Sequence, residues 1–126
     1  MKTSIIFAAL CLLAPVLSQA AFAGQPTTPS ALWSAFQADP DAFRQAHAER
    51  SITISAVVAD THISRYLTPV VSLVDKIQDE VRVICVLPRA DTHKLSDFKK
   101  GDRIMITGNF RAAREERIVI KQCQAQ

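Results

Sequence analysis

From Arg50 onward the apolar residues of this chain recur with a period of two, and this pattern constrains the fold more than any other feature. Apolar side chains at positions 52, 54, 56 and 58 alternate with Ser51, Thr53 and Ser55. Such alternation indicates a strand with one buried face. Four further apolar runs follow, at residues 70–74, 81–87, 102–110 and 117–123. We therefore expect five short strands in one domain, since 126 residues are too few for two.

The segments between these strands are polar or rich in turn formers. Residues 60–68 are predicted as a loop and residues 75–79 as a turn. A short helical piece that carries Leu95 and Phe98 is expected between the third and fourth strands, closed by Gly101, because glycine adopts positive φ at low cost. Five strands with a helix in this position fit a small closed or partly open barrel.

Two short helices are predicted ahead of the strands. The first is expected to begin at Ser30. The second is predicted over residues 41–49, with Asp39 as its N-cap and Pro40 in the first helical position. The aromatic side chains of these helices are expected to seal one end of the core rather than to form a binding site; they are Trp33, Phe36 and Phe43.

The N-terminus has the three parts of a secretory signal peptide. Lys2 gives a positive start, residues 5–13 form an apolar run, and Ala21-Phe22-Ala23 matches the small-x-small pattern before a cleavage site. The alternative is an uncleaved anchor, but Pro15 interrupts the apolar run before it reaches the roughly 20 residues that a membrane span requires. A lipoprotein signal at Cys11 is disfavoured by the large residue before it.

Cleavage before Gly24 would divide the chain into three parts. We predict a signal peptide at residues 1–23, a flexible lead-in at 24–30 and a folded domain with N-terminal helices at 31–126. The product is expected to be periplasmic or secreted, with no stable membrane span. Loss of Lys2 lowers the net charge from +3 to +2, which says little about the partner.

Cleavage also changes the cysteine count. It removes Cys11 and leaves Cys85 and Cys123, which are 38 residues apart. In an oxidising compartment such a pair is expected to form a disulfide rather than to remain as two buried thiols. The chain-entropy model gives this bond a stabilising effect of about 4 kcal/mol.

Taken in order, these features resemble a known family. A helical segment with a Trp, a Phe and an Asp-Pro step precedes five strands, and the third and fifth strands each carry a cysteine. Between them lies the run Leu95-x-x-Phe98-x-x-Gly101-Asp102-x-Ile104-x-Ile106-x-Gly108. From about Ala31 to Gln124 the chain resembles the exported OB-fold proteins grouped as the tRNA anticodon-binding-like (tRNA_anti-like) family.

The resemblance implies a mainly β, five-stranded OB-fold-like barrel preceded by a short helical segment, with one disulfide. Cys85 and Cys123 would join the third strand to the last. Gly108 would allow the bend that such a barrel needs at a corner. OB-fold barrels bind oligonucleotides, oligosaccharides or proteins over strands two and three and the flanking loops.

Seven residues are candidates for ligand binding. Some come from the polar segment 60–68, where Tyr66 is the one aromatic expected in a binding loop. Three others are arginines in or beside the last hairpin, which could form a rim for an anionic ligand, and Arg65 and Arg82 could join this rim. Glu115 and Glu116 lie among those arginines, so an ordinary solvated hairpin is the alternative. The candidates are His62, Arg65, Tyr66, Arg82, Arg111, Arg114 and Arg117.

Nothing in the sequence indicates catalysis. The histidines are far apart and lack the spacing of a metal pair, and no serine has a nucleophile-elbow setting. We therefore predict no enzyme activity, no metal and no cofactor.

The predicted function is that of a non-catalytic periplasmic binding module. Its partner would be an envelope protein, for instance of a secretion, conjugation or envelope-stress system, or an anionic envelope polymer. Single-stranded nucleic-acid binding is the first alternative, and an inhibitor or immunity protein is the second. The sequence predicts no oligomeric state.

Overall fold

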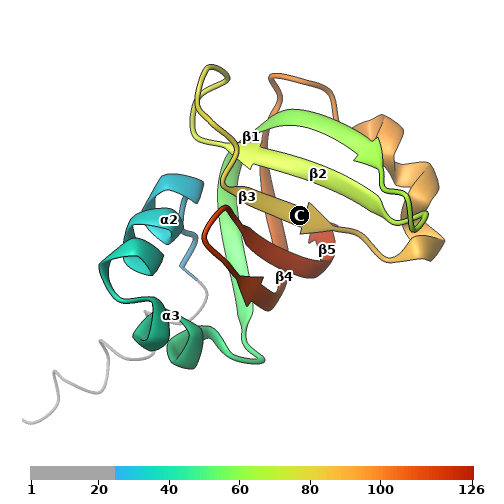
Figure 1. Ribbon diagram of the computed structural model, residues 1–126. Coiled ribbons are helices and arrows are strands. Elements are labelled where there is room, and N and C mark those ends of the chain that lie inside the picture. Colours follow the sequence, from blue (N-terminus) through green and yellow to red (C-terminus); the bar gives the residue numbers. More distant parts are fainter. Residues whose placement is uncertain (1–24) are drawn as a thin grey trace, which may run out of the picture.

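The computed structural model describes residues 25–126, and its strands close into a barrel in the order β1-β2-β3-β5-β4 (Figure 1). The expected signal peptide lies outside the described residues. The five-stranded, mainly β fold with preceding helices is confirmed. The elements are α2 Pro29–Ala38, α3 Pro40–His47, β1 Ser51–Ile63, β2 Pro69–Val74, β3 Val83–Val86, the 3-10 helix η2 Arg89–Asp97, β4 Arg103–Ala113 and β5 Ile118–Ala125.

Helix α2 begins before Ser30. The Thr28 hydroxyl accepts a hydrogen bond from the Ala31 N–H at 3.2 Å, so Thr28 is the N-cap, and the prediction of Ser30 is wrong. Ser30 instead donates through its backbone N–H and its hydroxyl to the Asp75 carboxylate, at 2.8 and 2.7 Å, and ties α2 to the β2–β3 turn. Thr27 pairs with β1, so the expected lead-in of residues 24–30 overlaps secondary structure.

Helix α3 follows the prediction closely. Asp39 caps it by accepting from the Ala42 N–H at 3.1 Å, and Pro40 occupies the first helical position. The helix ends at His47, two residues earlier than expected.

Strand β1 is longer than the sequence indicates. It pairs with β4 through its first half and with β2 through its second half, where His62 lies opposite Val70. The prediction of a loop from residue 60 is therefore wrong as far as Ile63. The cause is a bulge between Val58 and Asp60, which interrupts the alternation while pairing with β2 continues.

The other boundaries differ by a few residues. Strand β3 is shorter than predicted, and β4 extends to Ala113. Gly101 has the expected positive φ of 92°, but η2 ends at Asp97, so the glycine turns the chain into β4 and does not close the helix. Its N–H donates to the Val58 carbonyl at 2.8 Å.

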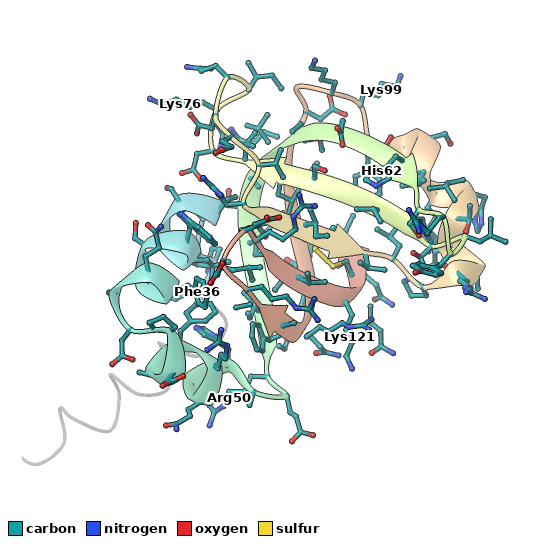
Figure 2. All side chains as sticks on the ribbon, in the orientation of Figure 1. Phe36, Arg50, His62, Lys76, Lys99 and Lys121 are labelled. Atoms are coloured by element: carbon teal, nitrogen blue, oxygen red, sulfur yellow. A yellow bond between two sulfur atoms is a disulfide. The ribbon has the colours of Figure 1, made fainter. Side chains whose placement is uncertain are left out.

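The core is an aliphatic barrel interior closed by aromatic rings at one end. The predicted disulfide Cys85–Cys123 is present, with the two Cα atoms 5.8 Å apart, and joins β3 to β5 (Figure 2). Phe36 and Phe43 of the helices are buried, and Phe43 packs edge-on against Phe110 of β4 with ring centroids 5.7 Å apart. The expectation that these rings seal the core is confirmed.

Candidate binding surface

The structure divides the predicted site residues between two ends of the barrel. Arg82, Arg111, Arg114 and Arg117 lie at the end covered by α2 and α3, whose place Figure 1 shows. His62, Arg65 and Tyr66 lie at the other end, beside η2, where Arg89 donates to the Tyr66 carbonyl at 2.8 Å. The seven residues therefore do not form one surface.

At the helix end, the turn between β4 and β5 forms what we call the arginine hairpin, residues 111–117. Arg111, Arg114 and Arg117 line a hollow of about 550 Å³. The turn is closed by a hydrogen bond from the Arg114 N–H to the Arg117 carbonyl at 3.0 Å. Within residues 25–126, these three exposed guanidinium groups form no ion pair or side-chain hydrogen bond. They are therefore available to a ligand.

Glu115 and Glu116 also line this hollow, as the sequence suggested. In the described part of the chain, however, neither carboxylate is paired with one of the three arginines. The glutamates reduce the net charge of the hairpin, but they leave each guanidinium unpaired.

A further arginine, Arg44 of α3, fixes the hairpin from the helix side. Its Nε and Nη2 donate to the Ala113 carbonyl at 3.2 and 2.9 Å, and its guanidinium lies 5.3 Å from the centre of the Phe36 ring. Two parallel donors on one carbonyl set the geometry of the hairpin relative to α3. Arg44 is not predictable as a site residue from the sequence, because a basic residue in the last turn of a helix is common for electrostatic reasons alone.

Arg82, which is predicted to bind ligand, makes contacts of its own within the chain. It donates to the Glu80 carboxylate at 2.6 Å and to the Glu116 carbonyl at 3.3 Å, and it lies over the Trp33 ring at 4.8 Å. Through these three contacts Arg82 connects α2, the segment before β3 and the arginine hairpin.

A row of small and aliphatic side chains, here called the outer row, crosses the outside of the barrel from this hollow. Register pairs place its members side by side on β4, β5, β3 and β2. The core side chains next to each of them point inward, so these residues face out. The row contains no aromatic ring, and only its β3 part is open in the strand two–three region expected for an OB-fold ligand, because Ser72 of β2 is buried. Its members are the half-buried Ala112, Val119 and Ile84 and the buried Ser72.

At the opposite end, the β1–β2 turn is exposed and apolar. Tyr66 and Leu67 are each 69% exposed, and Ile63 is 51% exposed. His62, which Figure 2 shows on the η2 side of the barrel, has its Nδ1 3.9 Å from an Asp60 carboxylate oxygen. Tyr66 was predicted from the sequence, but the exposed apolar residues beside it were not, because apolar residues in a strand pattern are usually buried.

Within residues 25–126, no three metal-ligating side chains gather into a possible metal site, and no helix is long and apolar enough to span a membrane. Burial lowers the pKa of His47, and the charge of Arg50 lowers it further. His47 lies beside Phe43 with ring centroids 4.4 Å apart, away from the arginine hairpin hollow.

The barrel order and the helix between β3 and β4 are those of an OB fold. The chain belongs to the tRNA_anti-like family, whose model matches residues 7–124. A solved structure with a similar fold is that of a Klebsiella pneumoniae protein named as a candidate nucleic acid-binding lipoprotein; the TM-score is 0.65 at 10% identity, over 90% of this chain and 97% of that one. A comparison with curated proteins finds no match.

Proposed function

We propose that this protein is a non-catalytic binding module of the bacterial envelope, periplasmic or secreted, whose arginine hairpin and outer row hold an extended anionic polymer. The observation that carries the proposal is the hollow in which Arg111, Arg114 and Arg117 present unpaired guanidinium groups. Guanidinium groups bind phosphate, sulfate and carboxylate oxygens in bidentate fashion. The outer row would contact the uncharged parts of the same polymer.

Rigidity of the hairpin supports this proposal. Arg44 and Arg82 hold the two sides of the turn through the carbonyls of Ala113 and Glu116. A ligand would therefore not need to order this turn, and that reduces the entropic cost of binding.

Titration with defined polyanions tests the proposal. The probes are polyphosphate, a sulfated polysaccharide and a single-stranded oligonucleotide, each labelled for fluorescence anisotropy at low salt. We expect Arg111→Gln/Arg114→Gln/Arg117→Gln to weaken binding of at least one probe about tenfold or more, because three charge-assisted contacts are lost. The matched control, Lys76→Gln/Lys99→Gln/Lys100→Gln, removes the same charge from other exposed loops. Equal losses in both triple variants, or no binding of any probe, would contradict the proposal.

Single-stranded nucleic acid is the second candidate, favoured by the name of the similar Klebsiella protein and by the OB fold. The arrangement of aromatic rings argues for contact with its phosphates rather than its bases. Trp33 is half-buried beside Arg82, and Tyr66 lies at the other end of the barrel, so the outer row offers no stacking platform. An abasic oligonucleotide should therefore bind as well as a normal one; a large loss would indicate base stacking instead.

An envelope protein with an acidic surface would meet the same three arginines, whether it belongs to secretion, conjugation or envelope-stress machinery or is the target of an inhibitor. No contact in the described chain favours one of these proteins over a polymer. Failure of all the polyanion probes, together with stoichiometric inhibition of a lytic enzyme, would favour the inhibitor role.

Export is part of the proposal and is tested separately. The intact mass of the protein recovered from the periplasm should correspond to a chain that begins at Gly24 and contains one disulfide. A retained or lipid-modified N-terminus would contradict cleavage at this site.

A further inference from the structure

The β1–β2 tip, residues 63–67, concentrates exposed apolar side chains at the end of the barrel away from α2 and α3, beside η2 (Figure 1). Three of the large hydrophobic residues that are exposed in the described chain lie within these five positions: Ile63, Tyr66 and Leu67. Ile77 and Met105, the others in that part of the chain, lie elsewhere. Single exposed hydrophobic residues are ordinary, but a cluster of them marks a contact surface.

Leu67 has a backbone conformation that its own packing does not explain. Its φ is +62°, in the left-handed region that favours glycine and asparagine. Because 69% of the residue is exposed, the leucine gains little burial within the chain in return for this strain. Strained residues that persist without a local gain are concentrated at functional sites.

The tip is also held in a fixed shape. The Ser64 N–H donates to the Thr68 carbonyl at 2.9 Å, the Leu67 N–H donates to the Ser64 carbonyl at 2.9 Å, and the two hydroxyls are 2.6 Å apart. Arg89 of η2 donates to the Tyr66 carbonyl. The apolar side chains are thus presented by a preorganised turn.

We propose that the β1–β2 tip inserts into the interface of a lipid bilayer. Tyrosine with its polar hydroxyl is typical of the membrane–water interface, and Tyr66 is 69% exposed at the tip. Leu67 and Ile63 would enter the acyl region, and the Arg65 side chain would extend to the headgroup phosphates.

The charge of the tip complements an anionic lipid surface. Residues 61–74 contain no carboxylate, and the turn itself carries Arg65. Of the nearby acids, Asp60 lies beside His62, and Asp91 of η2 is paired with Lys94 at 3.6 Å. Asp97 is a further acid on η2, so the excess positive charge is small. Apolar insertion therefore provides most of the affinity for the membrane, and anionic lipid increases this affinity only a few-fold.

This proposal goes beyond the proposed function, because the arginine hairpin lies at the other end of the barrel. A molecule seated on a membrane through its tip would present the hairpin away from the bilayer. Failure of one site can be distinguished from failure of the other, since the two tests change different residues.

Vesicle co-sedimentation with the chain from Gly24 onward tests the inference; this form contains every contact described above. Vesicles of phosphatidylcholine with phosphatidylglycerol are compared with vesicles of phosphatidylcholine alone. We expect binding to both, stronger to the first, and a loss of about tenfold or more for Tyr66→Ser/Leu67→Asn, because two inserted apolar side chains are removed. The matched control is Ile77→Ser, which removes an exposed apolar side chain from the β2–β3 turn and should leave binding unchanged.

Leu67→Asn alone separates loss of docking from loss of folding. Asparagine tolerates positive φ, so this variant should be at least as stable to urea as the original protein while its vesicle binding decreases. The inference would be overturned by absent vesicle binding, by an equal loss in Ile77→Ser, or by unchanged binding in the tip variants. Lipid-free self-association that the tip substitutions abolish, without vesicle binding, would assign the tip to a second copy of the chain and would also overturn it.

Discussion

Gly108 illustrates how a single position can depend on the closure of the barrel. It lies in β4 beside a shift of register, and a Cβ added there would be 2.6 Å from Cγ2 of Ile120 and 2.8 Å from Sγ of Cys123. We expect Gly108→Ala to lower the free energy of unfolding by about 2–3 kcal/mol, since the neighbours are barrel core. Urea denaturation with the disulfide intact measures this loss. Gly101→Ala serves as the comparison: its Cβ would meet open space, and only the φ of +92° opposes it, so a loss of about 1 kcal/mol is expected. A larger effect at Gly101 would contradict this account.

The single residue His47 is expected to make the stability of the domain depend on pH. Burial and the charge of Arg50 lower its pKa below the ordinary value of 6.5, so the unfolded chain binds the proton more tightly than the folded one. The stability associated with neutral His47 is therefore complete above this ordinary pKa and is lost as the pH falls through the lower, folded pKa. Urea midpoints should decrease between about pH 7 and pH 5, above the range in which carboxylates titrate. The decrease should be smaller in His47→Gln, and an unchanged decrease would assign it to other groups.

Among the elements, the arginine hairpin depends on α3 for its position. Arg44→Met keeps most of the side-chain stem but removes both donors to the part-buried Ala113 carbonyl. We expect a loss of about 1–2 kcal/mol and faster hydrogen exchange at the Arg114 amide, which closes the turn. Asp41→Ala is the matched control, because it removes only the exposed partner of Arg44, at 3.3 Å, and should cost about 0.5 kcal/mol or less. Unchanged exchange in Arg44→Met would show that the hairpin is rigid without this contact.

The helices and strands also show which features of the fold could be predicted from the sequence and which could not. Alternation in the first half of β1 and the Asp39-Pro40 helix start are local signals, and both predictions were confirmed. The end of β1 was missed because its support is the pairing with β2, beyond a bulge. The contacts of Arg82 were missed for a similar reason: its partners Trp33 and Glu116 are remote in sequence and meet it only in the folded chain.

At the scale of the whole molecule, the closure of the barrel explains why the seven candidate ligand-binding residues lie at two different ends. In the sequence, the polar segment 60–68 and the last hairpin are both loops next to barrel strands, and the resemblance to OB-fold proteins suggested one surface. In the fold, β1 runs from the helix end, where Ser51 lies opposite Asn109, to the η2 end, where Ile63 lies opposite Pro69. The β1–β2 turn and the β4–β5 turn therefore fall at opposite ends. Sequence periodicity identifies each strand, but it does not specify which end of the barrel each turn occupies.

The disulfide acts at this largest scale, because it lies at the place where the barrel closes. Strands β3 and β5 are parallel and share only three register pairs, fewer than any other pair of neighbouring strands here, and Cys85–Cys123 joins these two strands. Cys85→Ala/Cys123→Ala should lower the free energy of unfolding by about 4 kcal/mol, a large share of the stability of a domain of this size. Hydrogen exchange should also increase at the β3–β5 pairing before the β1–β4 pairing, since the first has fewer backbone hydrogen bonds to hold it. Thiol alkylation of the chain from Gly24 onward, without reductant, checks the protein before the substitutions are compared: two alkylated cysteines would show that the bond is absent. A double variant as stable as the original protein would mean that strand pairing alone closes the barrel.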